Sequence, residues 1–342
     1  MVLTLIVLAL AGVGVDILPV GTAAAACSVS ATGGTSNTTF TADDGTAYRI
    51  EAFEAVGADA LDVCANVTVD VLVVGGGGSS NAEHSGGGGA GGVVFEESIA
   101  LSPGSYPITV GAGGAAVPND RPAEGGNNGE NSSALGFVAI GGGSSGSYDH
   151  GGAATDAGKA GGSGGGAGGG DAEAEVGAAL QPASASGGFG HPGGEGLNDP
   201  HYLGGGGGGA DAAGGDATAD AGGDGGAGRD LSATFGTTYG EEGVFAGGGG
   251  GAGNEVYYGS ATYGVGGLGG GGNASGQAIL GDDRSWVYAE DGMPNTGGGG
   301  GGVARHEARD KNNDGLTTAA VSASGGSGVV LIRYVLPVAV AT

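Results

Sequence analysis

Three residues with side-chain oxygens and one glycine, near the C-terminal end, have the spacing found in calcium-binding loops. Asp310, Asn312 and Asp314 stand at positions one, three and five of a short segment, and Gly315 follows at position six. This arrangement matches the start of a calcium-binding loop. Position twelve, where such a loop carries a bidentate Glu, is Val321. The alternatives are a Ca²⁺ site and an ordinary polar turn, and we expect no other metal or cofactor.

Aromatic side chains form the second group that could bind a ligand. They lie between the glycine runs, in segments rich in Gly, Ser, Asn and Asp. Tyr and Trp among small polar residues are typical of adaptable binding loops, and their flat faces stack on sugars. The alternative is a structural role, in which they cover the ends of the glycine runs. These candidate ligand-binding residues are Tyr148, Tyr202, Tyr257, Tyr258, Tyr263, Trp286 and Tyr288.

No set of residues in the sequence has the spacing of a catalytic site. The histidines are scattered and match no usual zinc pattern, so we interpret them as surface residues. Gly-x-Gly-x-x-Gly and Gly-x-Ser-x-Gly patterns occur, but a chain with 90 Gly contains them by composition, and no helix is predicted after them. We therefore predict no catalytic or cofactor-binding residues and no enzymatic activity. The five histidines are His84, His150, His191, His201 and His306.

The N-terminal segment has the features of an export signal. Residues 2–15 are nearly all apolar, and the alanines at 23–26 supply a cleavage site. We predict a signal peptide over 1–26, a secreted, cell-surface protein, and no membrane insertion after cleavage. Cys27 and Cys64 are the only cysteines, and outside the cytosol such a pair predicts a disulfide. Lipidation of Cys27 is the alternative.

The charge balance excludes one class of partner. The chain has 36 Asp and Glu residues against 9 Lys and Arg residues, a formal net charge of -27. A nucleic-acid-binding protein needs the opposite sign in order to displace counterions from phosphates. Anionic membrane surfaces are disfavoured for the same reason. We interpret most of the acidic residues as solvated loop residues.

The glycine runs are predicted to be ordered. Ordering one Gly costs roughly 0.5–1 kcal/mol more than ordering Ala, so runs of Gly need a compensating structure. Several runs follow strand-like segments directly, as at 69–74 and 75–78. Gly can adopt a polyproline-II-type helix with about three residues per turn and no internal hydrogen bonds. Parallel or antiparallel runs can then bond to one another through their backbones.

Short apolar segments predict an all-β framework with very little helix. A pair of strands, 38–40 and 46–53, is expected around the turn at 43–45. Further strands are expected at 67–74, 93–95, 106–110, 134–140 and 328–334. No segment has helical periodicity with caps.

Several motifs resemble those of bacterial and phage secreted glycine-rich domains. They are VDVLVVGGGG at 69–78, GGGGAGGVV at 86–94, LSPGSYPITVGAGG at 101–114, AIGGG at 139–143 and SGVVLIRY at 327–334. The set is similar in kind to phage tail-tip adhesins and to the glycine-rich extracellular region of the anaplastic lymphoma kinase receptor. This resemblance implies a β-sandwich-like base that carries a bundle of polyglycine helices and displays loops for recognition.

These observations predict four segments and one preferred function. The segments are a signal peptide at 1–26, an N-terminal β extension with the disulfide at 27–65, a glycine-rich domain at 66–335 and a tail at 336–342. We expect an exported, non-enzymatic adhesin or recognition module that binds a cell-surface polysaccharide or receptor through the aromatic loops. The alternative is a structural protein of a sheath, envelope or fibre whose partner is itself.

Overall fold

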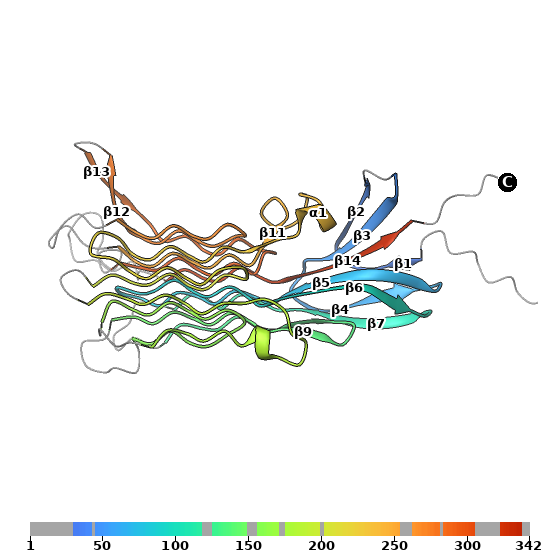
Figure 1. Ribbon diagram of the computed structural model, residues 1–342, viewed down its shortest axis with the longest axis horizontal. Coiled ribbons are helices and arrows are strands. Elements are labelled where there is room, and N and C mark those ends of the chain that lie inside the picture. Colours follow the sequence, from blue (N-terminus) through green and yellow to red (C-terminus); the bar gives the residue numbers. More distant parts are fainter. Residues whose placement is uncertain are drawn as a thin grey trace, which may run out of the picture.

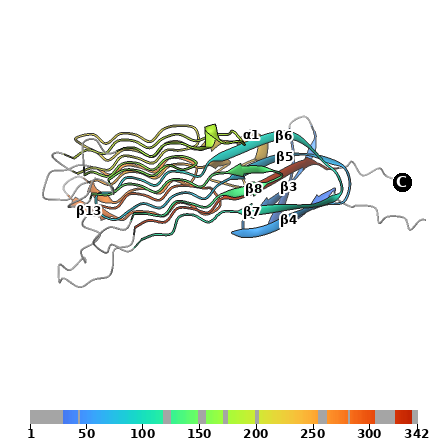
Figure 2. The same cartoon turned by 90° about the horizontal axis from the view of Figure 1, so that it is seen from below.

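The computed structural model describes most of the chain after residue 29. The described residues are 30–42, 45–117, 125–148, 156–170, 175–198, 202–253, 262–280, 283–304 and 322–336, with side chains described outside 277–286. The molecule is elongated, with paired β-sheets at one end and a bundle of glycine-rich segments extending from them (Figures 1 and 2). Both ends of the described chain lie at the sheet end.

Two antiparallel five-stranded sheets form the base. One has the strand order β1-β4-β7-β8-β9 and the other β2-β3-β14-β5-β6. The first contains β1 (Ala31–Thr32), β4 (Gly57–Val63), β7 (Gly104–Val110), β8 (Ser132–Ala134) and β9 (Phe137–Ala139). The second contains β2 (Ser36–Thr41), β3 (Ala47–Phe53), β14 (Val329–Val335), β5 (Val67–Val74) and β6 (Val93–Leu101). The last strand, β14, therefore lies between β3 and β5 in the middle of its sheet.

One hydrophobic core lies between the two sheets. Alternate residues of β5 and β14 point into it, and β4 and β7 of the other sheet face them. Because successive side chains of a strand point to opposite faces, each strand gives this core every second residue. Its buried members include Val69, Val71, Val73, Val330, Ile332, Leu61 and Ile108.

A second core covers the opposite face of the β14 sheet. The segment after β10 (Arg229–Asp230) forms the short helix α1 (Ser232–Phe235) and β11 (Val244–Phe245). Phe235 and Phe245 of this segment are buried against Leu72 and Leu331. Burial on both faces explains why β5 and β14 are almost continuous apolar runs rather than alternating ones.

Arg333 joins this covering segment to the sheet. Its guanidinium pairs with Asp70 on the neighbouring strand, Nη2 to Oδ2 at 2.6 Å, and Nη1 donates to the carbonyl of Thr234 at 2.8 Å. The same group lies 4.6 Å from the ring centroid of Tyr48. The two charged residues inside apolar runs are therefore partners across the β5–β14 pair.

The glycine-rich segments run side by side away from the base and return to it repeatedly (Figure 1). We call this set the bundle, and its far end the tip. The tip includes 79–85, 197–198, 202–203, 218–221 and a hairpin of β12 (Gly276–Leu280) and β13 (Asp283–Val287). The bundle consists of 75–80, 85–92, 111–116, 126–131, 140–147, 156–170, 175–180, 190–198, 202–228, 246–253, 262–275, 288–304 and 322–328.

Backbone hydrogen bonds within the bundle recur with a period of three. Successive N–H groups of the segment 86–91 donate to three different neighbouring segments in rotation, and each neighbour is reached again three residues later. A polyproline-II-type helix has three residues per turn, so this period agrees with that conformation. The six bonds, all 2.8–3.0 Å, join Gly86 to Gly146, Gly87 to Gly205, Gly88 to Gly300, Gly89 to Gly143, Ala90 to Gly208 and Gly91 to Gly297.

Close packing of these backbones explains why the runs are glycine. A Cβ added at Gly77 would overlap the carbonyl of Gly298, and one at Gly87 would overlap that of Gly249. Segments of other residues could not approach to hydrogen-bonding distance on all sides. The predicted fold class, an all-β framework with packed glycine runs, is therefore confirmed.

Most of the strand predictions are confirmed, but 134–140 is wrong, 93–95 is only the start of β6, and several observed strands were not predicted. The segment 134–140 was expected to be one strand, but it contains the end of β8, a turn at Leu135 and Gly136, and β9. Both turn residues have positive φ, 53° and 90°, which breaks the strand. β4, rich in Ala, Asp and Gly, was not predicted. Residues 31–63 supply four strands, distributed over both sheets.

Candidate functional site

Two of the candidate aromatic residues meet at the tip. The rings of Tyr148 and Tyr202 lie 5.0 Å apart, centroid to centroid, at an interplanar angle of 55°. His84 completes the group, 5.9 Å from Tyr148 in an edge-to-face arrangement and 5.6 Å from Tyr202. Both tyrosines are half-buried, whereas His84 is buried. Segments distant in sequence therefore present one aromatic cluster.

The interpretation of all histidines as surface residues is wrong for His84. It belongs to 79–85, the connection between two adjacent glycine runs, and every residue of that connection is buried. Glu83 and His84 have positive φ, 58° and 50°. The chain reverses direction here, and the buried ring of His84 lies against the rings of Tyr148 and Tyr202. The sequence signal was the polar stretch SSNAEHS between two glycine runs.

Serine hydroxyls replace carbonyl groups where the bundle ends at the tip. Ser85 Oγ accepts the N–H of Val303 at 2.8 Å, and Ser275 Oγ accepts that of Ala304 at 2.7 Å. Ser145 Oγ accepts the N–H of Asn81 at 2.9 Å. Buried backbone donors need such partners. The tip is therefore held by the same network as the bundle.

The other described aromatic candidates lie near the β12–β13 hairpin. Tyr263 is half-buried, and its side chain packs over Gly276, the first residue of β12. Tyr288 follows β13 and is 45% exposed. Trp286 lies in β13, and only its backbone is described. Tyr257 and Tyr258 lie outside the described residues.

Acidic and amide side chains at the edge of the bundle accept backbone hydrogen bonds. Asp224 Oδ1 accepts the N–H of Val265 at 2.8 Å, and Asn131 Oδ1 accepts that of Gly141 at 2.9 Å. Glu241 Oε2 accepts two N–H groups, of Gly269 and Gly270. An outer segment lacks a neighbouring run on one side, and these side chains supply the missing acceptors. Part of the negative charge is thus structural, beyond the solvated loops expected from composition.

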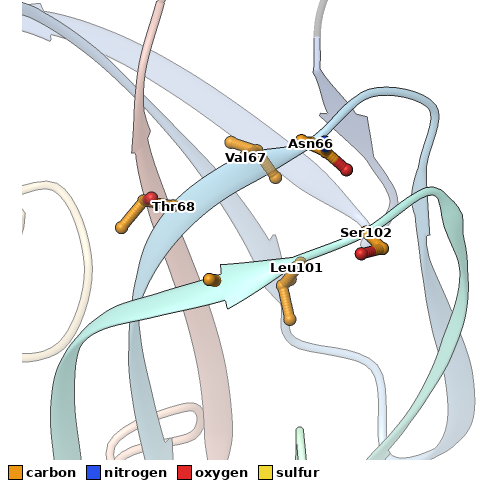
Figure 3. Close-up of a pocket in the computed structure, with 6 residues that line it drawn as sticks. Asn66, Val67, Thr68, Leu101 and Ser102 are labelled. Carbon is orange, nitrogen blue, oxygen red and sulfur yellow. The ribbon is translucent and has the colours of Figure 1, made fainter.

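A shallow pocket of about 340 Å³ lies at the base rather than at the tip (Figure 3). It is formed where β5 begins and β6 ends, between the side chains of Asn66 and Val67 on one strand and Leu101 and Ser102 on the other. Its lining contains no ionisable or aromatic side chain. This pocket therefore offers few groups for binding or catalysis.

Of the residues predicted to bind calcium or to form the disulfide, only Cys64 is among the described residues. Asp310, Asn312 and Asp314 lie outside the described residues, as does Cys27. Cys64 follows β4, where its N–H donates to the carbonyl of Ser30 at 3.1 Å. The register of β1 on β4 therefore brings Ser30, three positions after Cys27 in the sequence, beside Cys64. The disulfide remains a prediction.

The part of the chain that the structure describes contains no group of three or more His, Cys, Asp or Glu side chains that could hold a metal ion.

The sequence matches the glycine-rich domain family over residues 54–335. The chain belongs to that family. The matched region of this glycine-rich domain begins just before β4, so it includes β4 to β14 and the entire bundle. No curated protein was found to match the sequence.

The described helices of the glycine-rich domain are short. Besides α1 there is a three-residue 3₁₀-helix, η1 (Gln181–Ala183), near the base. No helix among the described residues is long and apolar enough to cross a membrane.

Proposed function

We propose that this glycine-rich domain is an exported, non-enzymatic recognition module that binds a cell-surface polymer or receptor through its tip. The observation that carries the proposal is the position of the aromatic candidates. Tyr148 and Tyr202 cluster at the tip, and Tyr288 is exposed beside the hairpin there. The ends of the described chain lie at the opposite end of the molecule. Attachment at the base would therefore leave the tip free.

The bundle suits a mount for recognition loops. Its segments are joined on several sides by backbone hydrogen bonds, so a connection at the tip rests on neighbours as well as on its own two ends. Loops held on a rigid scaffold lose less freedom on binding, which favours affinity. Sequence changes confined to the tip could alter the ligand without disturbing the base.

A polysaccharide is the ligand class that the tip chemistry favours. Tyrosine rings offer flat apolar faces for sugars, and their hydroxyl groups can donate and accept hydrogen bonds. The chain's net charge of -27 opposes nucleic acid. Self-association through sheet edges is less favoured, because Glu96 and Glu97 are exposed on the edge strand β6.

The test is binding of labelled residues 27–342 to intact cells and to a polysaccharide panel. The tip variant replaces Tyr148, Tyr202, Trp286 and Tyr288 with Ala, and its melting temperature is compared with that of the wild type. The control variant combines Val138→Ala with Leu180→Ala, two exposed apolar residues of the base region. We expect saturable binding that the tip variant loses and the control retains. Saturable binding retained by both variants would place the site elsewhere, and concentration-dependent assembly without any binding would favour the structural alternative.

A further inference from the structure

A groove of about 400 Å³ is lined by residues 265–273 and 290–293 of the bundle and by Glu241, which lies between α1 and β11. Glycines of 266–271 form part of its lining. These segments are orange in Figure 1. Because glycine has no side chain, an extended peptide could approach this surface closely.

Exposed apolar side chains form the walls of the groove. Val265 is 54% exposed, Leu268 57% and Met293 43%. Val265 and Leu268 are three residues apart, one turn of a three-residue helix, so they lie on the same side of their segment. Such residues gathered in one concave surface are typical of an interaction site.

Three carboxylates lie among these apolar walls. Glu290 and Asp291 are exposed, and Glu241 is half-buried. Each uses one oxygen for a described hydrogen bond: Glu241 Oε2 to backbone N–H groups, Glu290 Oε2 to Asn273, and Asp291 Oδ1 to the N–H of Ser324. No basic residue lines the groove. The groove is thus both apolar and negatively charged.

We propose that this groove binds an extended, basic peptide segment of a partner protein. The aliphatic stems of Lys or Arg would pack on Val265, Leu268 and Met293, as such stems do on apolar surfaces. Their charged ends would reach the carboxylates, in the charge-assisted geometry that carboxylates offer to guanidinium groups. The proposal does not depend on the tip.

A second copy of this chain is a poorer occupant. The described Lys and Arg side chains are already engaged within the molecule: Arg49 with Glu51, Lys159 with the Gly126 carbonyl, Arg229 with Asp211 and Arg333 with Asp70. Two chains that each carry a net charge of -27 also repel one another. Charge complementarity therefore favours a different, basic protein.

The experiment measures the affinity of a fluorescein-labelled peptide of alternating Arg and Gly by fluorescence anisotropy. It is done at physiological salt, about 0.15 M, so that long-range attraction is screened. The groove variant is Glu290→Gln with Asp291→Asn, in which an amide oxygen can replace the carboxylate oxygen that accepts each described hydrogen bond. The charge-matched control is Asp59→Asn with Asp62→Asn, two exposed residues of β4. Matching melting temperatures establish that both variants fold.

A second pair of variants tests the apolar walls. The groove variant replaces two apolar side chains of the walls, Leu268→Ser with Met293→Ser. Its control replaces two exposed apolar side chains elsewhere, Val56→Ser with Leu180→Ser. We expect each groove variant to weaken binding by about tenfold and each control by less than about twofold. Equal losses in groove and control variants, unchanged affinity in either groove variant, or no saturable binding would overturn the proposal. Equally tight binding of an alternating Glu and Gly peptide would do so too.

Discussion

Tyr334 connects the two sheets of the base through a single hydroxyl group. The residue lies on β14, is 1% exposed, and its Oη donates to the carbonyl of Ala31 on β1 at 2.6 Å. Burial, reinforced by the nearby Glu51 carboxylate, raises the pKa of Tyr334 to about 12. The phenolate is therefore disfavoured in the folded protein.

This shift predicts a loss of stability at high pH. The folded-state pKa lies above the ordinary value of 10.0, so the folded protein holds its proton where the unfolded chain releases it. The contribution is fully present below pH 10.0 and is lost as pH rises towards about 12. Tyr334→Phe should remove this part of the pH dependence and lower stability at neutral pH by about 1 kcal/mol.

Urea unfolding of the wild type and Tyr334→Phe at neutral and alkaline pH measures both effects. Tyr288→Phe, at an exposed position, is the control and should follow the wild type. A Tyr334→Phe variant that loses as much stability at alkaline pH as the wild type would show that another group is responsible.

Not every residue-scale contact was predictable. The segment VVLIRY predicted β14, but nothing near it identified Ala31 as the partner of Tyr334, some 300 positions earlier. The same holds for the tip, where Tyr148 and Tyr202 were candidates while their contact with each other and with His84 was not foreseen. The composition of a segment shows which residue types could bind a ligand. The topology of the chain decides which of those residues contact one another.

At the scale of elements, substitutions at glycine should affect stability differently in the bundle and in the base. Gly88 lies in the bundle, and an added Cβ would overlap the carbonyl of Gly78 and approach the nitrogen of Gly300. Gly104 begins β7, and an added Cβ there meets nothing closer than 3.9 Å. The two positions have the same residue type and opposite surroundings.

We expect Gly88→Ala to destabilise the protein by about 3 kcal/mol or more, because backbone segments would have to separate and lose hydrogen bonds. Gly104→Ala should change stability by less than about 0.5 kcal/mol. Chemical unfolding of the two variants gives the comparison. Similar stabilities for both would mean that the bundle is looser than its hydrogen bonds indicate.

The same contrast explains which elements the sequence predicted. β5 and β14 are apolar because both of their faces are buried, and the glycine runs are uninterrupted because a Cβ does not fit. β4 escaped prediction because its exposed residues, such as Asp59 and Asp62, give it little strand propensity. Its structure comes from pairing with β7, a non-local contact.

At the scale of the whole molecule, base and bundle are built as one unit. The chain leaves the base and returns to it many times, and segments far apart in sequence are bonded, as Gly77 is to Gly326 at 2.9 Å. No large part of the bundle can therefore separate without breaking bonds to several other segments. The tip depends on this unit for its position.

Amide hydrogen exchange tests this account most directly, because the claim is that the glycine runs are a rigid, hydrogen-bonded mount. Amides of 86–91, each bonded to a neighbouring segment, should exchange slower than in an unfolded chain by a thousandfold or more, on the order expected for opening a stable unit. Exposed turn residues of the base, such as Val56 and Gly136, supply the fast reference. Exchange of 86–91 at the rate of a flexible glycine linker would contradict the account.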